Sequence, residues 1–235
     1  SFRLVQEGGR SYSREYPVEK IGLVEWIRNS KLGGSRILAE FTVSPMLKAY
    51  CGSAIILQPK FEIPRTRNDV EEYLKELFHG TEKSFHSFCV RKGARFFVFD
   101  RGAFGDMLPY SSRYCAAAAN IPTSAMAYRM YYKKERAKLR GFYEIEPPPE
   151  FQFISLKYVL FKVISQEDVD KSREYESQAR ACLKDRKVDR ARELAMKAFN
   201  HYWRRQVPGL APTAGYPVDA VRFMAQTAAA RRSLG

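Results

Sequence analysis

The sequence lacks the short motifs that mark the common enzyme classes. It contains no G-x-x-x-x-G-K-[ST] phosphate loop, no G-x-G-x-x-G dinucleotide fingerprint and no G-x-S-x-G nucleophile motif. Its few histidines have no metal-binding spacing; they are His79, His86 and His201. Glu144, Glu146 and Glu150 flank three prolines in what we expect to be an exposed linker, where burial cannot tune a pKa for catalysis. We therefore expect a non-catalytic protein that needs no cofactor.

Cysteine pairs and long apolar runs are also missing. The four cysteines (Cys51, Cys89, Cys115 and Cys182) lie far apart without a C-x-x-C pair, which argues against a zinc site and favours reduced thiols. No apolar run reaches the roughly 20 residues that a membrane-spanning helix needs. The chain begins at Ser1 without a signal-peptide core, which is typical of a mature product or of a trimmed chain. Together with the basic charge, this suggests a protein of the mitochondrial matrix whose targeting segment has been removed.

Acidic residues are in the minority. The 235 residues include 40 Lys and Arg against 26 Asp and Glu, a formal net charge of +14. This excess favours an anionic partner such as nucleic acid or a lipid surface, although a well-solvated, repulsive surface is the alternative. The excess occurs on both sides of the proline run at 147–149, as expected for contact with phosphate at several places.

The hydrophobic pattern predicts four regions. They are an extended segment over 1–16, an α+β core over 17–146, a proline-rich linker and strand over 147–165, and a helical region over 166–235. In the core we expect helices from Pro17 to the Gly33-Gly34 pair and over 70–79, 81–91, 109–120 and 122–140, with strands over 36–43, 53–57 and 94–99. Beyond the prolines we expect one long or two short strands over 151–164, helices over 167–185 and 187–206, and a helix over 218–232. The predicted fold class is α+β: a mixed sheet covered by helices, followed by a C-terminal αα-hairpin and a terminal helix.

The segment from Tyr128 to Arg140 is the most informative for function. On a single helix, one face would carry a cationic stripe of Arg129, Lys133, Arg136 and Arg140, with Lys134 and Lys138 close by. Such a stripe could follow a phosphate backbone, and the tyrosines could stack on bases. The alternative is a solvated helix face with the tyrosines in the core.

Basic and aromatic residues also gather near the C-terminus. Tyr202 and Trp203 precede Arg204 and Arg205, so this group could stack on a base or could anchor the helix to a neighbouring protein. Arg231 and Arg232 in the terminal tail are suited to phosphate contact.

These features predict a non-catalytic structural subunit of a large ribonucleoprotein, specifically an organellar (mitochondrial) ribosomal protein that contacts rRNA and neighbouring proteins. The alternative is an accessory subunit of a mitochondrial respiratory-chain or ATP synthase complex, in contact with other subunits and anionic lipid headgroups. An enzyme whose site leaves no local motif is the third reading.

Overall fold

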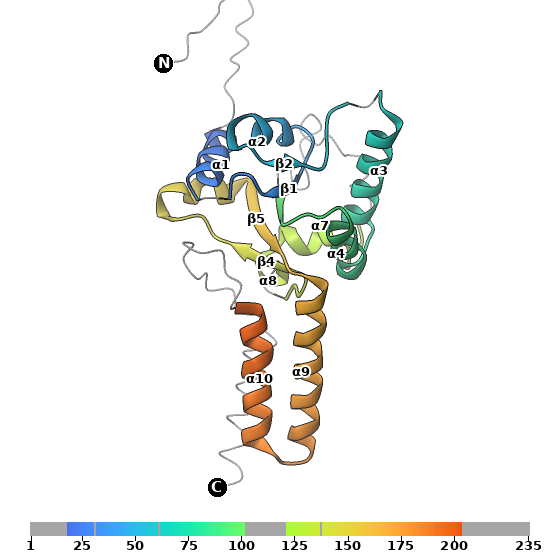
Figure 1. Ribbon diagram of the computed structural model, residues 1–235, viewed down its shortest axis with the longest axis vertical. Coiled ribbons are helices and arrows are strands. Elements are labelled where there is room, and N and C mark those ends of the chain that lie inside the picture. The colour runs from blue at the N-terminus through green and yellow to red at the C-terminus, as the bar shows by residue number, and fades with distance from the viewer. Residues whose placement is uncertain (1–17, 31, 61, 102–120, 137, 204–235) are drawn as a thin grey trace, which may run out of the picture.

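The structure, a computed structural model, describes residues 18–30, 32–60, 62–101, 121–136 and 138–203 (Figure 1). Side chains are described throughout these ranges except at Lys133 and over 199–203. The segments expected over 1–16, 109–120 and 218–232 lie outside the described residues.

A five-stranded mixed sheet with the strand order β2-β1-β3-β5-β4 forms the centre of the described chain. The strands are β1 (Arg36–Ala39), β2 (Ala54–Ile55), β3 (Phe96–Asp100), β4 (Phe142–Ile145) and β5 (Tyr158–Val163). β1 is parallel to β2 and β3, whereas β5 is antiparallel to β3 and β4. The expected α+β class with a mixed sheet is confirmed, and β5 is an interior strand of that sheet.

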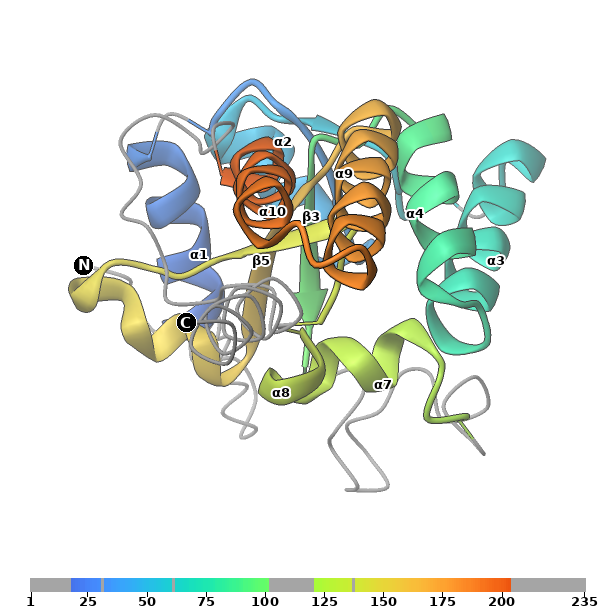
Figure 2. The ribbon, with the colours of Figure 1, turned by 90° about the horizontal axis from the view of Figure 1, so that it is seen from below.

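Helices cover both faces of the sheet. One layer consists of α1 (Val18–Asn29), α2 (Ser44–Cys51) and the 3-10 helix η1 (Pro149–Leu156). The other consists of α3 (Pro64–Phe78), α4 (Glu82–Arg91) and α7 (Met126–Tyr131). Figure 2 shows the two layers on either side of β3.

The sequence of β3 explains why both faces need cover. Side chains alternate along a strand, so Phe97 and Phe99 join the core beneath α3, α4 and α7, while Phe96 and Val98 join the core beneath α1, α2 and η1. All four side chains are buried. A strand that is apolar on both sides is typical of a sheet between two helical layers.

Local structure differs from the sequence prediction around the two short parallel strands. The strand expected over 36–43 ends at Ala39, and α2 follows with a proline in its first turn. Gly52 ends α2 in the left-handed conformation, with φ of 64°. α3 begins at Pro64, several residues before the expected start, because proline is well suited to the first turn of a helix.

The segment after the proline run also differs. Residues 149–156 form η1, and only Tyr158–Val163 is a strand, so the prediction of one long or two short strands over 151–164 was wrong for its first half. The apolar residues of η1 alternate in sequence, but they do not line one buried face as they would in a strand. Of these residues only Ile154 is fully buried, against α1 and the sheet.

The expected αα-hairpin is confirmed as α9 (Gln166–Lys184) and α10 (Val188–Trp203), which extend away from the sheet in Figure 1. Ser165 caps α9, since its hydroxyl accepts a hydrogen bond from the backbone N–H of Asp168 at 3.2 Å. The small side chains of Ala179 and Ala195 allow close packing of the two helices around Leu194.

Candidate anion-binding pocket

The cationic segment from Tyr128 to Arg140 does not form one helix. Tyr132 has an extended backbone (φ −92°, ψ 122°) and separates α7 from the short helix α8 (Lys133–Arg136). The prediction of a continuous helix over 122–140 was therefore wrong, because tertiary contacts override local helix propensity here. The cations of this segment consequently do not form a stripe on one helical face.

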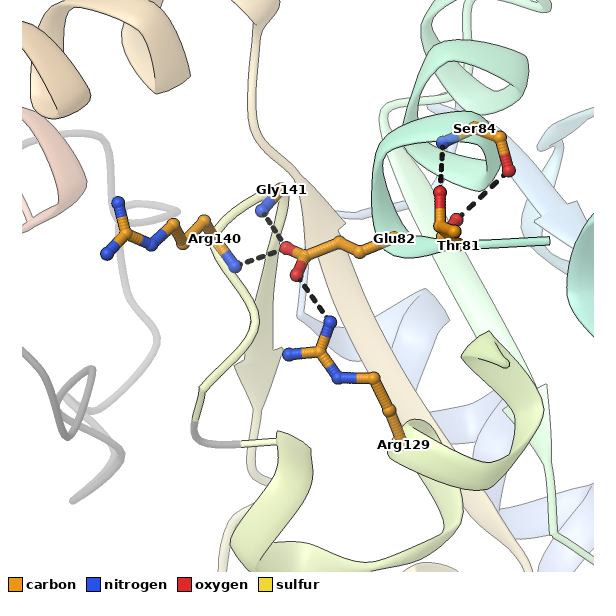
Figure 3. A network of polar contacts seen from close by, with 6 residues as sticks. All are labelled: Thr81, Glu82, Ser84, Arg129, Arg140 and Gly141. Carbon is orange, nitrogen blue, oxygen red and sulfur yellow. Dashed lines mark hydrogen bonds and ion pairs between the residues drawn. The ribbon is translucent and has the colours of Figure 1, made fainter. Parts of the chain in front are cut away.

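Glu82 at the start of α4 compensates the charge of Arg129. In Figure 3 its carboxylate accepts hydrogen bonds from the Arg129 guanidinium at 2.8 Å, from the backbone N–H of Gly141 at 2.8 Å and from the backbone N–H of Arg140. The Glu82 and Arg129 side chains are only 17% and 20% exposed. This network joins α4, α7 and the start of β4.

Arg136 and Arg140 also form ion pairs within the protein. Arg136 makes a two-point contact with Glu144 of β4, with Nε–Oε2 at 2.9 Å and Nη2–Oε1 at 3.1 Å. The expectation that Glu144 lies in an exposed linker was therefore wrong. Arg140 pairs with Glu176 of α9 at 2.9 Å and so links the hairpin to the sheet domain. These arginines hold elements of the fold together.

The other residues predicted to bind RNA or partners are less constrained. Lys134 and Lys138 are exposed, and Lys138 pairs with Glu135 at 2.5 Å. The side chains of Lys133, Tyr202 and Trp203 and the whole of Arg204, Arg205, Arg231 and Arg232 lie outside the described residues. Their assignment to RNA or partner binding stays a prediction.

The carboxyl ends of β1 and β3 form a topological switch point, the usual place for ligands in open α/β sheets. There Glu40 is buried, and its carboxylate accepts hydrogen bonds from the backbone N–H of Thr42 at 2.9 Å and from the Thr42 hydroxyl. These bonds fix the turn between β1 and α2, which is a structural role.

A different part of the sheet carries a cavity of about 460 Å³. Its walls are the start of β1, the end of β2 with the segment that follows it, the first turns of α3, and the end of α4. Its charged lining residues are four cations and one carboxylate: Arg36, Arg65, Arg91, Lys92 and Asp69. We call this cavity the arginine pocket.

Two of the four cations form a fixed wall. Lys92 donates a hydrogen bond to Asp69 at 2.6 Å and lies 3.3 Å from Glu72, which also pairs with Arg91. The hydrogen bond to Asp69 raises the pKa of Lys92, so this ammonium remains charged. Arg91 and Lys92 both lie over the ring of Phe88, at 5.8 and 5.6 Å from its centroid. The carboxylates of Asp69 and Glu72 are therefore already neutralised by Lys92 and Arg91.

Arg36 of β1 and Arg65 of α3 are exposed side chains that line the pocket. Neither forms an ion pair with any other residue in the described ranges. Because Asp69 and Glu72 are matched by Lys92 and Arg91, the pocket retains two positive charges that no residue in the described part of the chain compensates. Concave surfaces of one charge sign concentrate counter-ions, so an anion is favoured here.

Neutral groups complete the pocket. The side chains of Thr66 and Gln58 offer a hydroxyl and an amide for hydrogen bonding, and Ile55 and Ile56 offer apolar surface. Gly93 has φ of 69°, and a Cβ at this position would lie 3.3 Å from the Arg36 Nη1 atom. The glycine therefore both allows the turn before β3 and leaves room for the Arg36 guanidinium.

Sequence reasoning missed this pocket because its cations come from three separate segments. The parallel pairing of β1 and β3 brings these segments together, with α3 and α4 connecting β2 to β3. The local signals were the Pro-Arg-Thr start of α3 and the Arg-Lys-Gly sequence at the end of α4.

Within the described ranges, no group of three or more His, Cys, Asp or Glu side chains could hold a metal ion. No helix in the same ranges is both long and apolar enough to cross a membrane.

Comparison with known proteins gives little further information. No family model matches the sequence, and no curated protein matches it. Among solved structures, the chain is similar to the C-terminal globular domain of oligosaccharyltransferase from Archaeoglobus fulgidus, with a TM-score of 0.46 and 11% identity. The match covers 63% of this chain and 99% of that domain. At this level, the likeness carries no functional argument.

Proposed function

We propose that this chain is a non-catalytic, RNA-contacting structural subunit of a large ribonucleoprotein, of the kind found in a mitochondrial ribosome, and that the arginine pocket is one of its phosphate contacts. The observation that carries the proposal is the pair Arg36 and Arg65, two exposed guanidinium groups without an ion-pair partner among the described residues, facing one cavity. Arginine suits this role because its planar group donates two parallel hydrogen bonds to phosphate oxygens.

A third arginine extends this surface. Arg95 precedes β3, is exposed, and donates its backbone N–H to the carbonyl of Arg36 at 2.9 Å. Arg36 and Arg95 are therefore neighbours at the start of adjacent parallel strands, so Arg95 could contact the phosphate next to the one in the pocket.

The proposal predicts a specific salt dependence. If Arg36, Arg65 and Arg95 together neutralise three phosphate charges, the affinity for single-stranded RNA should fall about 20-fold between about 50 and 200 mM salt. Fluorescence anisotropy with a labelled single-stranded RNA measures this. The double variant Arg36→Glu/Arg65→Glu should bind at least about 10-fold more weakly and show a shallower salt slope.

Arg28→Glu is the matched control. Arg28 is an exposed arginine in the last turn of α1, which covers the other face of the sheet. This variant makes the same charge change as either single pocket variant, Arg36→Glu or Arg65→Glu, and half that of the double variant. It is therefore compared with the single variants, and its RNA affinity should match the wild type. Equal losses in Arg28→Glu and in the pocket variants would mean that only net charge matters and would contradict a localised contact.

A second candidate function, an accessory subunit of a mitochondrial respiratory-chain or ATP synthase complex, is favoured by an exposed apolar surface. Val18 and Ile21 on α1 and Phe153 and Leu156 on η1 are all exposed, Leu156 by 74%. The two helices touch, because a Cβ on Gly22 would lie 2.6 Å from the Phe153 ring. Such a surface suits a subunit contact. Association that resists salt and nuclease would favour this candidate.

A further inference from the structure

We infer that the arginine pocket binds a terminal phosphate monoester, at an RNA end or on a mononucleotide, and not an internal phosphodiester. This inference rests on the proposed function for its RNA form, and it names the chemical group that the pocket would select.

Charge balance is the first reason. The pocket retains two positive charges after Asp69 and Glu72 are matched by Lys92 and Arg91. A phosphate monoester carries between about −1.5 and −2 at pH 7. A phosphodiester carries a single negative charge, so it would leave one of the two arginines uncompensated.

The size and chemistry of the walls are the second reason. A volume of about 460 Å³ is more than a phosphate group needs and lies within the range of small-molecule pockets, about 300–1,000 Å³. The apolar wall of Ile55 and Ile56 could pack against a sugar or base, while Thr66 and Gln58 could bond its hydroxyl or ring atoms. A nucleoside monophosphate combines these charged and apolar parts.

The third reason is that part of the site is held in place before a ligand arrives. The Lys92 ammonium is fixed by Asp69 at 2.6 Å and by the Phe88 ring, and Gly93 leaves space for the Arg36 guanidinium. Fewer side chains must then be fixed on binding, which limits the entropic cost.

The test compares one short single-stranded RNA with a 5′-phosphate, a 3′-phosphate or hydroxyl ends, in competition with AMP and with inorganic phosphate. We expect at least one phosphorylated RNA to bind about 10-fold more tightly than the hydroxyl form, and AMP to displace it better than inorganic phosphate. Arg36→Glu and Arg65→Glu should abolish this difference, whereas Arg28→Glu should preserve it. Because all three arginines are exposed, circular dichroism should confirm that every variant folds.

The outcomes separate this inference from the proposed function. Equal binding of all RNA forms without competition by AMP would overturn the terminal-phosphate site and leave RNA binding intact. Binding of AMP without binding of any RNA would support the monoester site and overturn the RNA function. Inorganic phosphate competing as well as AMP would overturn the role of the isoleucine wall.

Discussion

Removing the charge of Glu82 should destabilise the protein strongly. Glu82→Gln keeps the shape of the side chain but leaves the Arg129 guanidinium, 20% exposed, without its anion. The same change weakens the bonds that the carboxylate accepts from the backbone N–H groups of Arg140 and Gly141. Breaking a buried ion pair lowers the free energy of unfolding by about 3–5 kcal/mol. Because this pair is partly exposed, we expect the free energy of unfolding to fall by about 2–4 kcal/mol.

Urea denaturation measures this loss as a lower unfolding midpoint with an unchanged slope. In the double variant Glu82→Gln/Arg129→Gln, the unpaired cation is gone. Its loss of unfolding free energy should therefore be smaller, by at least about 1 kcal/mol, than the sum of the losses in the two single variants. Glu167→Gln is the control, since Glu167 pairs with Lys171 at 2.5 Å on the exposed surface of α9. The urea midpoint of this variant should match that of the wild type. A loss below about 0.5 kcal/mol in Glu82→Gln would refute the role of this network.

Three further predictions concern packing, capping and pH. Gly141→Ala should cost about 2 kcal/mol or more in a thermal melt, because its Cβ would lie 2.5 Å from Cδ2 of the buried His86; an unchanged melting temperature would contradict this. Ser165→Ala should cost about 1 kcal/mol and speed hydrogen exchange in the first turn of α9, whereas unchanged exchange would show that the cap is unimportant. Burial raises the pKa of the Cys89 thiol well above its ordinary 9.0, and burial, followed by the charges of Glu40 and Asp100, raises that of Tyr73 well above 10.0. Both groups stay neutral in the folded state at a pH where they ionise in the unfolded chain, so the urea midpoint should fall as pH rises above about 9; a flat profile to pH 10.5 would disprove this.

The class of fold followed from the sequence because apolar periodicity marks elements that bury one or two faces. The Phe96–Asp100 strand and the α9/α10 hairpin were correct on this basis. The boundaries near prolines were less accurate. The same proline chemistry that suits an exposed connection also suits the first turn of α2, α3 or η1, and only tertiary packing distinguishes these cases.

The candidate site was harder to predict, for a physical reason. A cation in the sequence does not reveal whether a carboxylate from a distant segment lies beside it. Arg129 and Arg136 looked accessible on a predicted helix, yet each pairs with a glutamate from another element. Arg36 and Arg65 carried no motif, and the sheet topology brought them to one cavity.

Sedimentation from native extract tests the central proposal most directly. The protein is recovered at modest salt, and the extract is treated with nuclease or left untreated before the gradient. The proposal predicts that the protein sediments with a heavy particle and that nuclease releases it, with Arg36→Glu/Arg65→Glu weakening the association. A nuclease-resistant complex with membrane proteins would contradict the proposal and favour the accessory-subunit function.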